Sequence, residues 1–182
     1  MIIEDTRQQA GKHEHIERWM REHGVEFAVR GSALPFGDYM VEGSNVSIDT
    51  KQSVQELAID LGRDHKRFVR ELVRARDEGY RLVILIEERA AYNDRSKLYG
   101  WLPRPCVSCR RCNPRRKDSK CSRFRCKPMQ GAALAQQMGT LEEKYGVRFE
   151  FCRRRDAARR ICELLGVTYD EPYAQLDRTG GC

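Results

Sequence analysis

Long apolar runs are missing from this sequence of 182 residues, and no stretch approaches the roughly 18 residues of a membrane-spanning helix. The N-terminal residues also lack the pattern of a secretory signal, in which an apolar stretch follows a basic one. Charged residues make up 34% of the chain, and its mean hydropathy is −0.71. We therefore expect a soluble, cytoplasmic protein of about one domain that has no membrane contact.

Acidic residues are scarce in one part of the chain. Residues 89–130 hold 13 Lys and Arg but two acidic residues, whereas the remainder has slightly more acidic than basic residues. Such a run is either a solvated charged loop or a surface that binds a polyanion, most often nucleic acid. We favour nucleic acid because the same segment carries a cluster of cysteines.

Apolar periodicity predicts strands that alternate with helices, which is typical of an α/β sandwich. Strands are expected at residues 1–4, 25–29, 34–42, 45–51, 81–87 and 147–152. Helices are expected at residues 12–23, 53–77 with a break near 62–64, 130–145 and 154–165. The irregular residues 89–128, called the cysteine-rich insertion below, interrupt a predicted domain of residues 1–166. Residues 167–182 are expected to form a tail.

Acidic residues near three predicted strands are candidates for catalysis. Asp5 follows the first strand, Asp38 follows a glycine, and Asp49 and Lys51 end the strand of residues 45–51. Residues two apart in a strand share a face, so Asp49 and Lys51 should point the same way. A hairpin could bring Asp38 beside them. Two carboxylates can hold Mg²⁺, and a lysine can orient or help to deprotonate an attacking water. Surface turns with an exposed ion pair are the alternative.

The order of these motifs resembles the nuclease domain of the XPF family of structure-specific endonucleases, in the restriction-endonuclease-like PD-(D/E)XK superfamily. The family pattern runs Val-Asp-x-Arg-Glu, then Gly-Asp-Tyr/Phe, then Glu-Arg-Lys. The matching segments here are Ile2-Ile3-Glu4-Asp5-Thr6-Arg7-Gln8, Gly37-Asp38-Tyr39 and Asp49-Thr50-Lys51. The resemblance covers roughly residues 1–88 and 129–166. It implies an α/β fold with helices flanking a mixed β-sheet.

The resemblance also implies roles for individual residues. Asp38 and Asp49 would be the ligands of a catalytic Mg²⁺ or Mn²⁺, and Lys51 would position the attacking water. Asp5 would be a further active-site acid, and Arg7 a phosphate or structural contact. The implied reaction is in-line attack of water on a phosphodiester of DNA.

The sequence departs from the family pattern at several points, and these limit which of the family's properties are expected here. Gln8 stands where the family has glutamate, and Thr50 stands where it has an arginine that contacts DNA. Gln55 takes the place of a later acid, with Glu56 next to it. No tandem helix-hairpin-helix domain follows in this sequence, so the preferred DNA structure and dimerisation stay open.

Five cysteines of the cysteine-rich insertion have the spacing of metal ligands. They are Cys106, Cys109, Cys112, Cys121 and Cys126. Because no histidine lies among them, a structural Zn²⁺ site with four cysteine ligands is the simplest assignment. We favour the two outer pairs, with Cys112 able to replace a member of the first pair. An iron–sulfur cluster is the alternative metal group, and a loop of unrelated free cysteines is the alternative without a metal.

Basic residues are interleaved with these cysteines, and we expect a metal-stapled loop that clamps phosphates. The candidate DNA-binding residues of the insertion are Arg110, Arg111, Arg115, Arg116, Lys117, Lys120, Arg123 and Arg125. Phe124 is expected either to stack on a base or to pack against the metal loop. The insertion is too polar to fold alone, so the metal would supply its order.

The other cysteines and the histidines are expected to have structural roles. Cys152 and Cys162 fall in strand and helix patterns and should be small buried residues. His13 and the three other histidines lack ligand spacing, so we expect them at the surface or at helix ends.

These observations together predict a metal-dependent DNA endonuclease with a zinc-stapled basic insertion. The sequence does not distinguish between repair, recombination and phage DNA processing as the biological process. The alternative is a zinc-containing nucleic-acid-binding protein that uses the nuclease fold without catalysis. A protein-interaction role for the insertion would need an acidic partner. A homodimer or a protein partner stays open.

Overall fold

A computed structural model describes the chain except residues 6–10, 31–33, 114, 117–119, 125–126 and 172–182. The expectations for Arg7, Lys117, Arg125 and Cys126 therefore lie outside the described residues, as does most of the predicted tail. No helix in the described part of the chain is both long and apolar enough to span a membrane.

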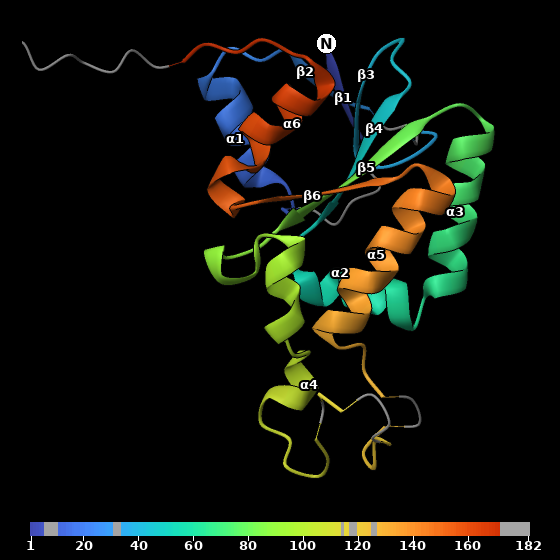
Figure 1. The fold of residues 1–182 in the computed structure, drawn as a ribbon. Helices are drawn as coiled ribbons and strands as arrows, with labels where there is room; N and C mark the ends of the chain where they lie inside the picture. The colour runs from blue at the N-terminus through green and yellow to red at the C-terminus, as the bar shows by residue number, and fades with distance from the viewer. Residues whose placement is uncertain (6–10, 31–33, 114, 117–119, 125–126, 172–182) are drawn as a thin grey trace, which may run out of the picture.

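A six-stranded mixed sheet forms the centre of the molecule, with strand order β2-β1-β3-β4-β5-β6 (Figure 1). The strands are β1 (Ile2–Asp5), β2 (Phe27–Arg30), β3 (Tyr39–Val41), β4 (Val46–Lys51), β5 (Arg81–Glu87) and β6 (Arg148–Cys152). Strand β3 runs antiparallel to its neighbours β1 and β4, and the pairs β1–β2, β4–β5 and β5–β6 are parallel. The mixed α/β architecture that the sequence predicted is confirmed.

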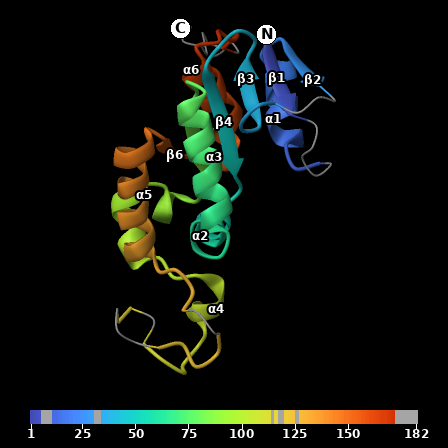
Figure 2. The same cartoon turned by 90° about the vertical axis from the view of Figure 1, so that its right-hand side faces the viewer.

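Helices cover both faces of the sheet (Figures 1 and 2). Helices α1 (Glu14–Glu22) and α6 (Ala157–Leu165) pack on one face, and α2 (Val54–Gly62), α3 (His65–Asp77) and α5 (Gly131–Tyr145) pack on the other. The short α4 (Arg104–Val107) lies in the cysteine-rich insertion, and short 3₁₀ helices include Ala90–Tyr92, Arg95–Gly100 and Arg154–Asp156. The predicted break between α2 and α3 is confirmed.

Strand β5 shows why the sheet needs helices on both faces. Leu82, Ile84 and Ile86 belong to the core under α2, α3 and α5, whereas Val83 and Leu85 belong to the core under α1 and α6. All five side chains are at most 3% exposed. The continuous apolar run thus reflects a strand buried on both sides, as predicted.

One strand is shorter than the sequence predicted. Only Tyr39–Val41 of the expected strand at residues 34–42 is extended in the sheet, and residues 35–38 form bends. Gly37 has φ +63°, and a Cβ there would lie 2.6 Å from the carbonyl oxygen of Ile48. A turn that crosses β4 so closely cannot continue as a ladder strand.

The first part of the cysteine-rich insertion is a stem that packs into the domain. Leu98 and Trp101 are 0% and 7% exposed and lie in the core beneath α5. Gly131, the first residue of α5, donates its N–H to Trp101 O at 3.1 Å. A Cβ on Gly131 would lie 1.6 Å from Leu98 O, so the junction requires glycine. Residues after the stem project away from the sheet, below α2 and α5 in Figure 1.

Candidate active site

A cleft of about 720 Å³ opens between the end of β4, the turn at residues 35–38 and helix α3. Four of its lining residues are those that the sequence singled out: Asp5, Asp38, Asp49 and Lys51. They come from the end of β1, the turn before β3 and the end of β4. The sheet therefore gathers side chains that lie more than forty residues apart in sequence.

Asp49 and Lys51 point to the same face of β4, as strand periodicity predicted. In the parallel ladder they stand beside Ile84 and Ile86 of β5, which face the core under α2 and α3. Lys51 Nζ lies 2.8 Å from Asp49 Oδ2 and 3.1 Å from Asp60 Oδ2. Lys51 therefore forms ion pairs with two carboxylates. The second of them, Asp60 on α2, was not revealed by sequence spacing.

Burial and neighbouring charges shift the protonation of this pair. Burial raises the pKa of Asp49 to about 7, with Lys51 opposing the shift and Asp38 and Glu71 adding to it. Burial acts to lower the pKa of Lys51, but the carboxylates of Asp49 and Asp60 outweigh it and raise that pKa above its usual value. Lys51 is therefore an ammonium ion that can donate a hydrogen bond but cannot accept a proton at neutral pH.

Asp38 is held by the strand next to it. Its Oδ2 accepts hydrogen bonds from Thr50 N at 2.9 Å and from Thr50 Oγ1 at 2.5 Å. Its own N–H donates to Ile48 O at 2.7 Å. These bonds fix a carboxylate that is 2% exposed at the wall of the cleft, on the same side as Asp49.

Asp5 is 3% exposed at the end of β1, where its Oδ2 accepts a hydrogen bond from Leu34 N at 3.2 Å. The backbone N–H of Asp5 donates to Asp38 O at 2.9 Å, which brings the two acidic residues to adjacent positions in the cleft wall. The structure thus brings all four candidate catalytic residues together, while Arg7 lies outside the described residues.

A buried hydrogen-bond chain stands behind Asp38, and no pattern in the sequence revealed it. His13 was expected at the surface or at a helix end. It does precede α1, but the surface expectation is wrong because the side chain is 3% exposed. Its Nδ1 lies 2.9 Å from Glu4 Oε1, and its Nε2 lies 3.1 Å from Thr50 Oγ1.

Tyr39 completes this chain by donating its phenolic O–H to Glu4 Oε1 at 3.0 Å. Burial and the nearby Glu4 carboxylate raise the pKa of Tyr39, so the phenol stays protonated. The chain therefore runs from Tyr39 through Glu4 and His13 to Thr50, the residue that holds Asp38. His13 lies 37 residues from Thr50 and shows no ligand spacing, so the sequence did not reveal this contact.

The carboxylates of the cleft suit a hard divalent cation. Mg²⁺ is commonly bound through one or two carboxylates, with water completing its octahedral shell. Asp38 and Asp49 meet that need, although among the described residues no three His, Cys, Asp or Glu side chains are grouped to hold a metal. Oxygen donors with an ammonium beside them fit Mg²⁺ or Mn²⁺ better than a softer metal.

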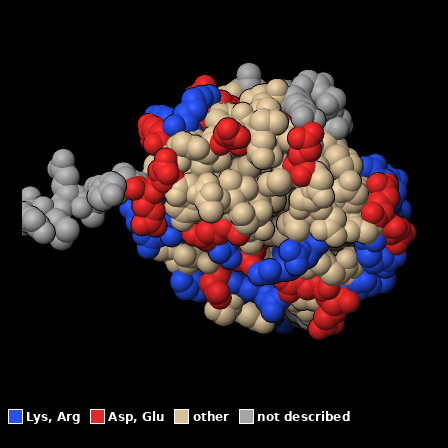
Figure 3. Space-filling view, turned by 90° about the horizontal axis from the view of Figure 1, so that it is seen from above, with Lys and Arg blue, Asp and Glu red and all other residues tan. Residues whose placement is uncertain are grey.

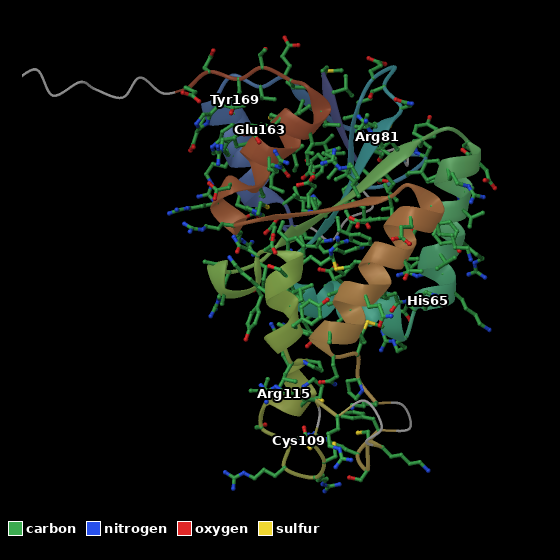
Figure 4. The ribbon with its side chains drawn as sticks, viewed as in Figure 1. His65, Arg81, Cys109, Arg115, Glu163 and Tyr169 are labelled. Carbon is green, nitrogen blue, oxygen red and sulfur yellow. The ribbon has the colours of Figure 1, made fainter. Side chains whose placement is uncertain are left out.

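The cysteine-rich insertion gathers sulfur atoms at its projecting end, where Figure 4 labels Cys109 and Arg115. Partial burial raises the pKa of Cys112, and the neighbouring thiols of Cys121, Cys109 and Cys106 raise it further, in that order. Cys121 Sγ accepts a hydrogen bond from Phe124 N at 3.3 Å. Cys106 lies in α4, and the other three thiols follow it in the projecting part of the insertion. Among the described residues no three of these thiols are grouped to hold a metal, so the metal site stays a prediction.

Basic side chains surround these thiols. The described ones, all exposed, are Arg110, Arg111, Arg115, Arg116, Lys120 and Arg123. The guanidinium of Arg123 lies 5.4 Å from the ring centroid of Phe124, which is 39% exposed. Outside the insertion, Cys152 and Cys162 are buried as expected, and burial raises their pKa values to about 12 and about 11.

Gln55, which replaces an acid of the family pattern, has a different role here. Its Oε1 accepts a hydrogen bond from Arg104 N at 2.7 Å, at the start of α4. The residue therefore ties the projecting part of the insertion to α2, one turn from Asp60. The sequence alone gave no sign of this contact.

A mixed sheet covered by helices, with acids and a lysine converging near the C-terminal ends of the interior strands β1 and β4, defines a nuclease-like α/β fold. The fold is similar to solved structures of XPF from Aeropyrum pernix, with a TM-score of 0.57 at 18% identity over 90% of this chain. XPF from Aeropyrum pernix in complex with DNA gives a TM-score of 0.56 at 19% identity over 91% of the chain. This chain covers 62% of either neighbour. The chain therefore has an XPF-like nuclease fold.

No protein-family model matches the sequence, and no curated protein does.

Proposed function

We propose that this protein is a Mg²⁺- or Mn²⁺-dependent endonuclease that hydrolyses phosphodiester bonds of DNA. The observation that supports it is the convergence of Asp38, Asp49 and Lys51 in one cleft, with Asp5 beside them. The buried carboxylate of Asp38 and the partly buried one of Asp49, beside a fixed ammonium, form an arrangement that can hold a divalent cation and orient water. The XPF-like fold adds support, and one of its solved neighbours is a complex with DNA.

Each side chain has a distinct part in this mechanism. Asp38 and Asp49 would hold the cation, which when bound would stabilise the negative charge that develops on the phosphate. The Lys51 ammonium, fixed between Asp49 and Asp60, would orient the attacking water and donate a hydrogen bond to a phosphate oxygen. Because its pKa is raised, we assign it this orienting role and not that of a proton acceptor. Asp5 would stabilise the backbone position of Asp38.

We further propose that the cysteine-rich insertion binds one structural Zn²⁺ through four of its five clustered cysteines. Tetrahedral thiolate sites suit zinc, and the insertion beyond its stem buries few apolar side chains that could order it. The surrounding arginines and lysines would then contact DNA phosphates from fixed positions. An iron–sulfur cluster would show itself by bound iron and a visible absorbance band.

The test of catalysis compares Asp38→Asn and Asp49→Asn with Asp77→Asn, an exposed aspartate at the end of α3. Cleavage of labelled flap, fork and plain duplex DNA would be measured with Mg²⁺ and with Mn²⁺. We expect the two cleft variants to lose at least ~10²-fold in rate, with melting temperature and DNA affinity retained, and the control to keep its rate. Full activity in both cleft variants would exclude the site.

Wild-type protein that binds DNA without cleaving any of these substrates would favour the non-catalytic alternative, a nucleic-acid-binding protein on a nuclease fold.

A further inference from the structure

Helix α3 carries a row of arginines along the candidate active-site cleft. Arg67, Arg70 and Arg74 follow one another at spacings of three and four residues, which places them on one face of the helix. All three line the same cleft as Asp38 and Asp49. We call these three residues the α3 row.

Two members of the row are fixed by their neighbours. Arg67 Nη2 lies 3.6 Å from Asp60 Oδ1, so it shares Asp60 with Lys51. Arg74 Nη2 donates to Pro35 O at 2.7 Å, and its guanidinium lies 4.6 Å from the ring centroid of Phe36. Arg67 is thus tied to the ion-pair partner of Lys51, and Arg74 is tied to the turn that carries Asp38.

The middle member of the row is different. Arg70 is exposed, and in the described part of the chain it makes no ion pair or side-chain hydrogen bond. A guanidinium that borders a cleft without an acidic partner is suited to bind an external anion, because its planar donors match phosphate oxygens.

The charge distribution of the cleft fits a nucleic-acid strand. Its floor is acidic and would repel phosphate without a cation, whereas the α3 row supplies positive charge at its rim. Seven residues of helix span about 10 Å. Along B-form DNA, phosphates of one strand advance by about 3.4 Å per nucleotide. The row is thus as long as about three base-pair steps measured along the axis of a duplex.

The row also points toward the cysteine-rich insertion. Helix α3 begins beside α2, near the labelled His65 in Figure 4, and the insertion projects below α2 in Figures 1 and 2. The exposed Arg63 and Lys66 lie at this lower end of the helix. By contrast, the middle of the face seen in Figure 3 is mostly uncharged, with both signs mixed around it.

We propose that the α3 row binds the phosphates of the DNA strand to be cut, and directs that strand from the cleft toward the basic insertion. This inference rests on the proposed DNA endonuclease function. It assigns to α3 the phosphate contacts next to the reacting bond, and to the insertion contacts that are more distant.

The test measures binding without cleavage, by fluorescence anisotropy of a labelled DNA duplex and single strand without added Mg²⁺. Arg70→Gln is compared with Arg18→Gln, an exposed arginine on α1 that likewise has no described ion-pair partner. We expect Arg70→Gln to weaken binding by about tenfold. The slope of log K against log salt should fall by about 0.7 to 0.9. Arg18→Gln should stay within about twofold of wild type, and Arg70→Lys should keep the salt slope.

Equal losses in Arg70→Gln and Arg18→Gln would replace the row with diffuse charge attraction, and unchanged binding in Arg70→Gln would overturn the inference. The proposed catalysis fails separately. If Arg70→Gln weakens binding while wild-type protein never cleaves, the row stands as a phosphate-binding surface for DNA and the endonuclease function falls. If wild-type protein cleaves and Arg70→Gln binds and cleaves normally, only the row falls.

Discussion

The cleft and the projecting end of the insertion are organised in opposite ways. Asp38 in the cleft wall and His13 behind it are at most 4% exposed and are held by several hydrogen bonds from neighbouring elements. In the insertion beyond Pro103, Cys106 is the single side chain of the described residues up to 124 that is buried. Both regions carry charged groups suited to metals or phosphates, but the first is ordered by packing and the second is not.

The two predicted metals would therefore have different effects on the structure around them. Packing and hydrogen bonds hold the carboxylates of the cleft in place, so Mg²⁺ would add charge to a framework that protein contacts already order. The insertion buries too little apolar surface to offset the entropy of ordering its chain. Its metal would therefore create the structure to which it binds.

The largest expected effect comes from removing the metal of the insertion. Purified protein should contain about one zinc per chain. Cys121→Ser with Cys126→Ser should abolish zinc binding, make residues near 105–127 sensitive to protease and weaken DNA binding, more so at low salt. Elemental analysis, limited proteolysis and melting temperature would be measured, with Cys182→Ser as control. Loss of the folded core in the double variant would contradict the view that the core is ordered independently of the insertion's metal.

A second prediction tests whether the stem of the insertion belongs to the packed region. Gly131→Ala should destabilise the protein by about 3 kcal/mol, because the added Cβ meets Leu98 O at 1.6 Å. Gly139→Ala, in the same helix, meets its nearest atom at 3.6 Å and should be neutral or stabilising by up to ~1 kcal/mol. Denaturant unfolding of both variants is the measurement. Equal stability would mean that the stem does not pack as described.

A third prediction concerns the hydrogen-bond chain behind Asp38. His13→Gln should weaken Mg²⁺ binding by about tenfold or more, because Thr50 loses the group that orients its hydroxyl. His65→Gln, whose ring contacts Gln137 away from the cleft, should bind Mg²⁺ like wild type. Calorimetric titration would measure the Mg²⁺ affinity of both variants, and thermal unfolding would measure their melting temperatures. If His13 had a purely structural role, His13→Gln would lower the melting temperature and leave the Mg²⁺ affinity unchanged.

The smallest expected effect is the pH dependence of the cleft. The raised pKa of Asp49, about 7, means that a proton competes with the cation. Mg²⁺ should therefore bind about tenfold more tightly at pH 8 than at pH 6. Without metal, this group stabilises the fold fully below pH 3.8, and the contribution is lost as pH rises through about 7. Asp49→Asn should remove both trends, and a flat Mg²⁺ affinity in wild type would contradict the assignment.

Much of the fold follows from local patterns. Residues 82–86 are five consecutive apolar residues, and a run this short favours a strand buried on both faces. Asp49 and Lys51 share a face because strand geometry alternates with period two, whatever surrounds it. The shortened β3 could not be foreseen, since it depends on how closely Gly37 crosses β4.

Some residues of the candidate site could be identified from the sequence, and others could not. Asp5, Asp38, Asp49 and Lys51 were identified by motif order, which resides in the sequence. His13, Asp60 and Arg70 were not, although the arginine spacing on α3 was visible and could have been read as a helix face. Their roles depend on which helix packs beside which strand.

The sequence by itself determined the alternating elements, the acidic motifs and the concentration of cysteine and positive charge in one segment. These are properties of near neighbours, set by backbone periodicity and composition. Only the tertiary structure decided that His13 lies behind Asp38, that Asp60 holds Lys51 and that the α3 row borders the cleft. Contacts of this kind join residues that are distant along the chain, and they exist because burial of both faces of the sheet fixes the helices against it.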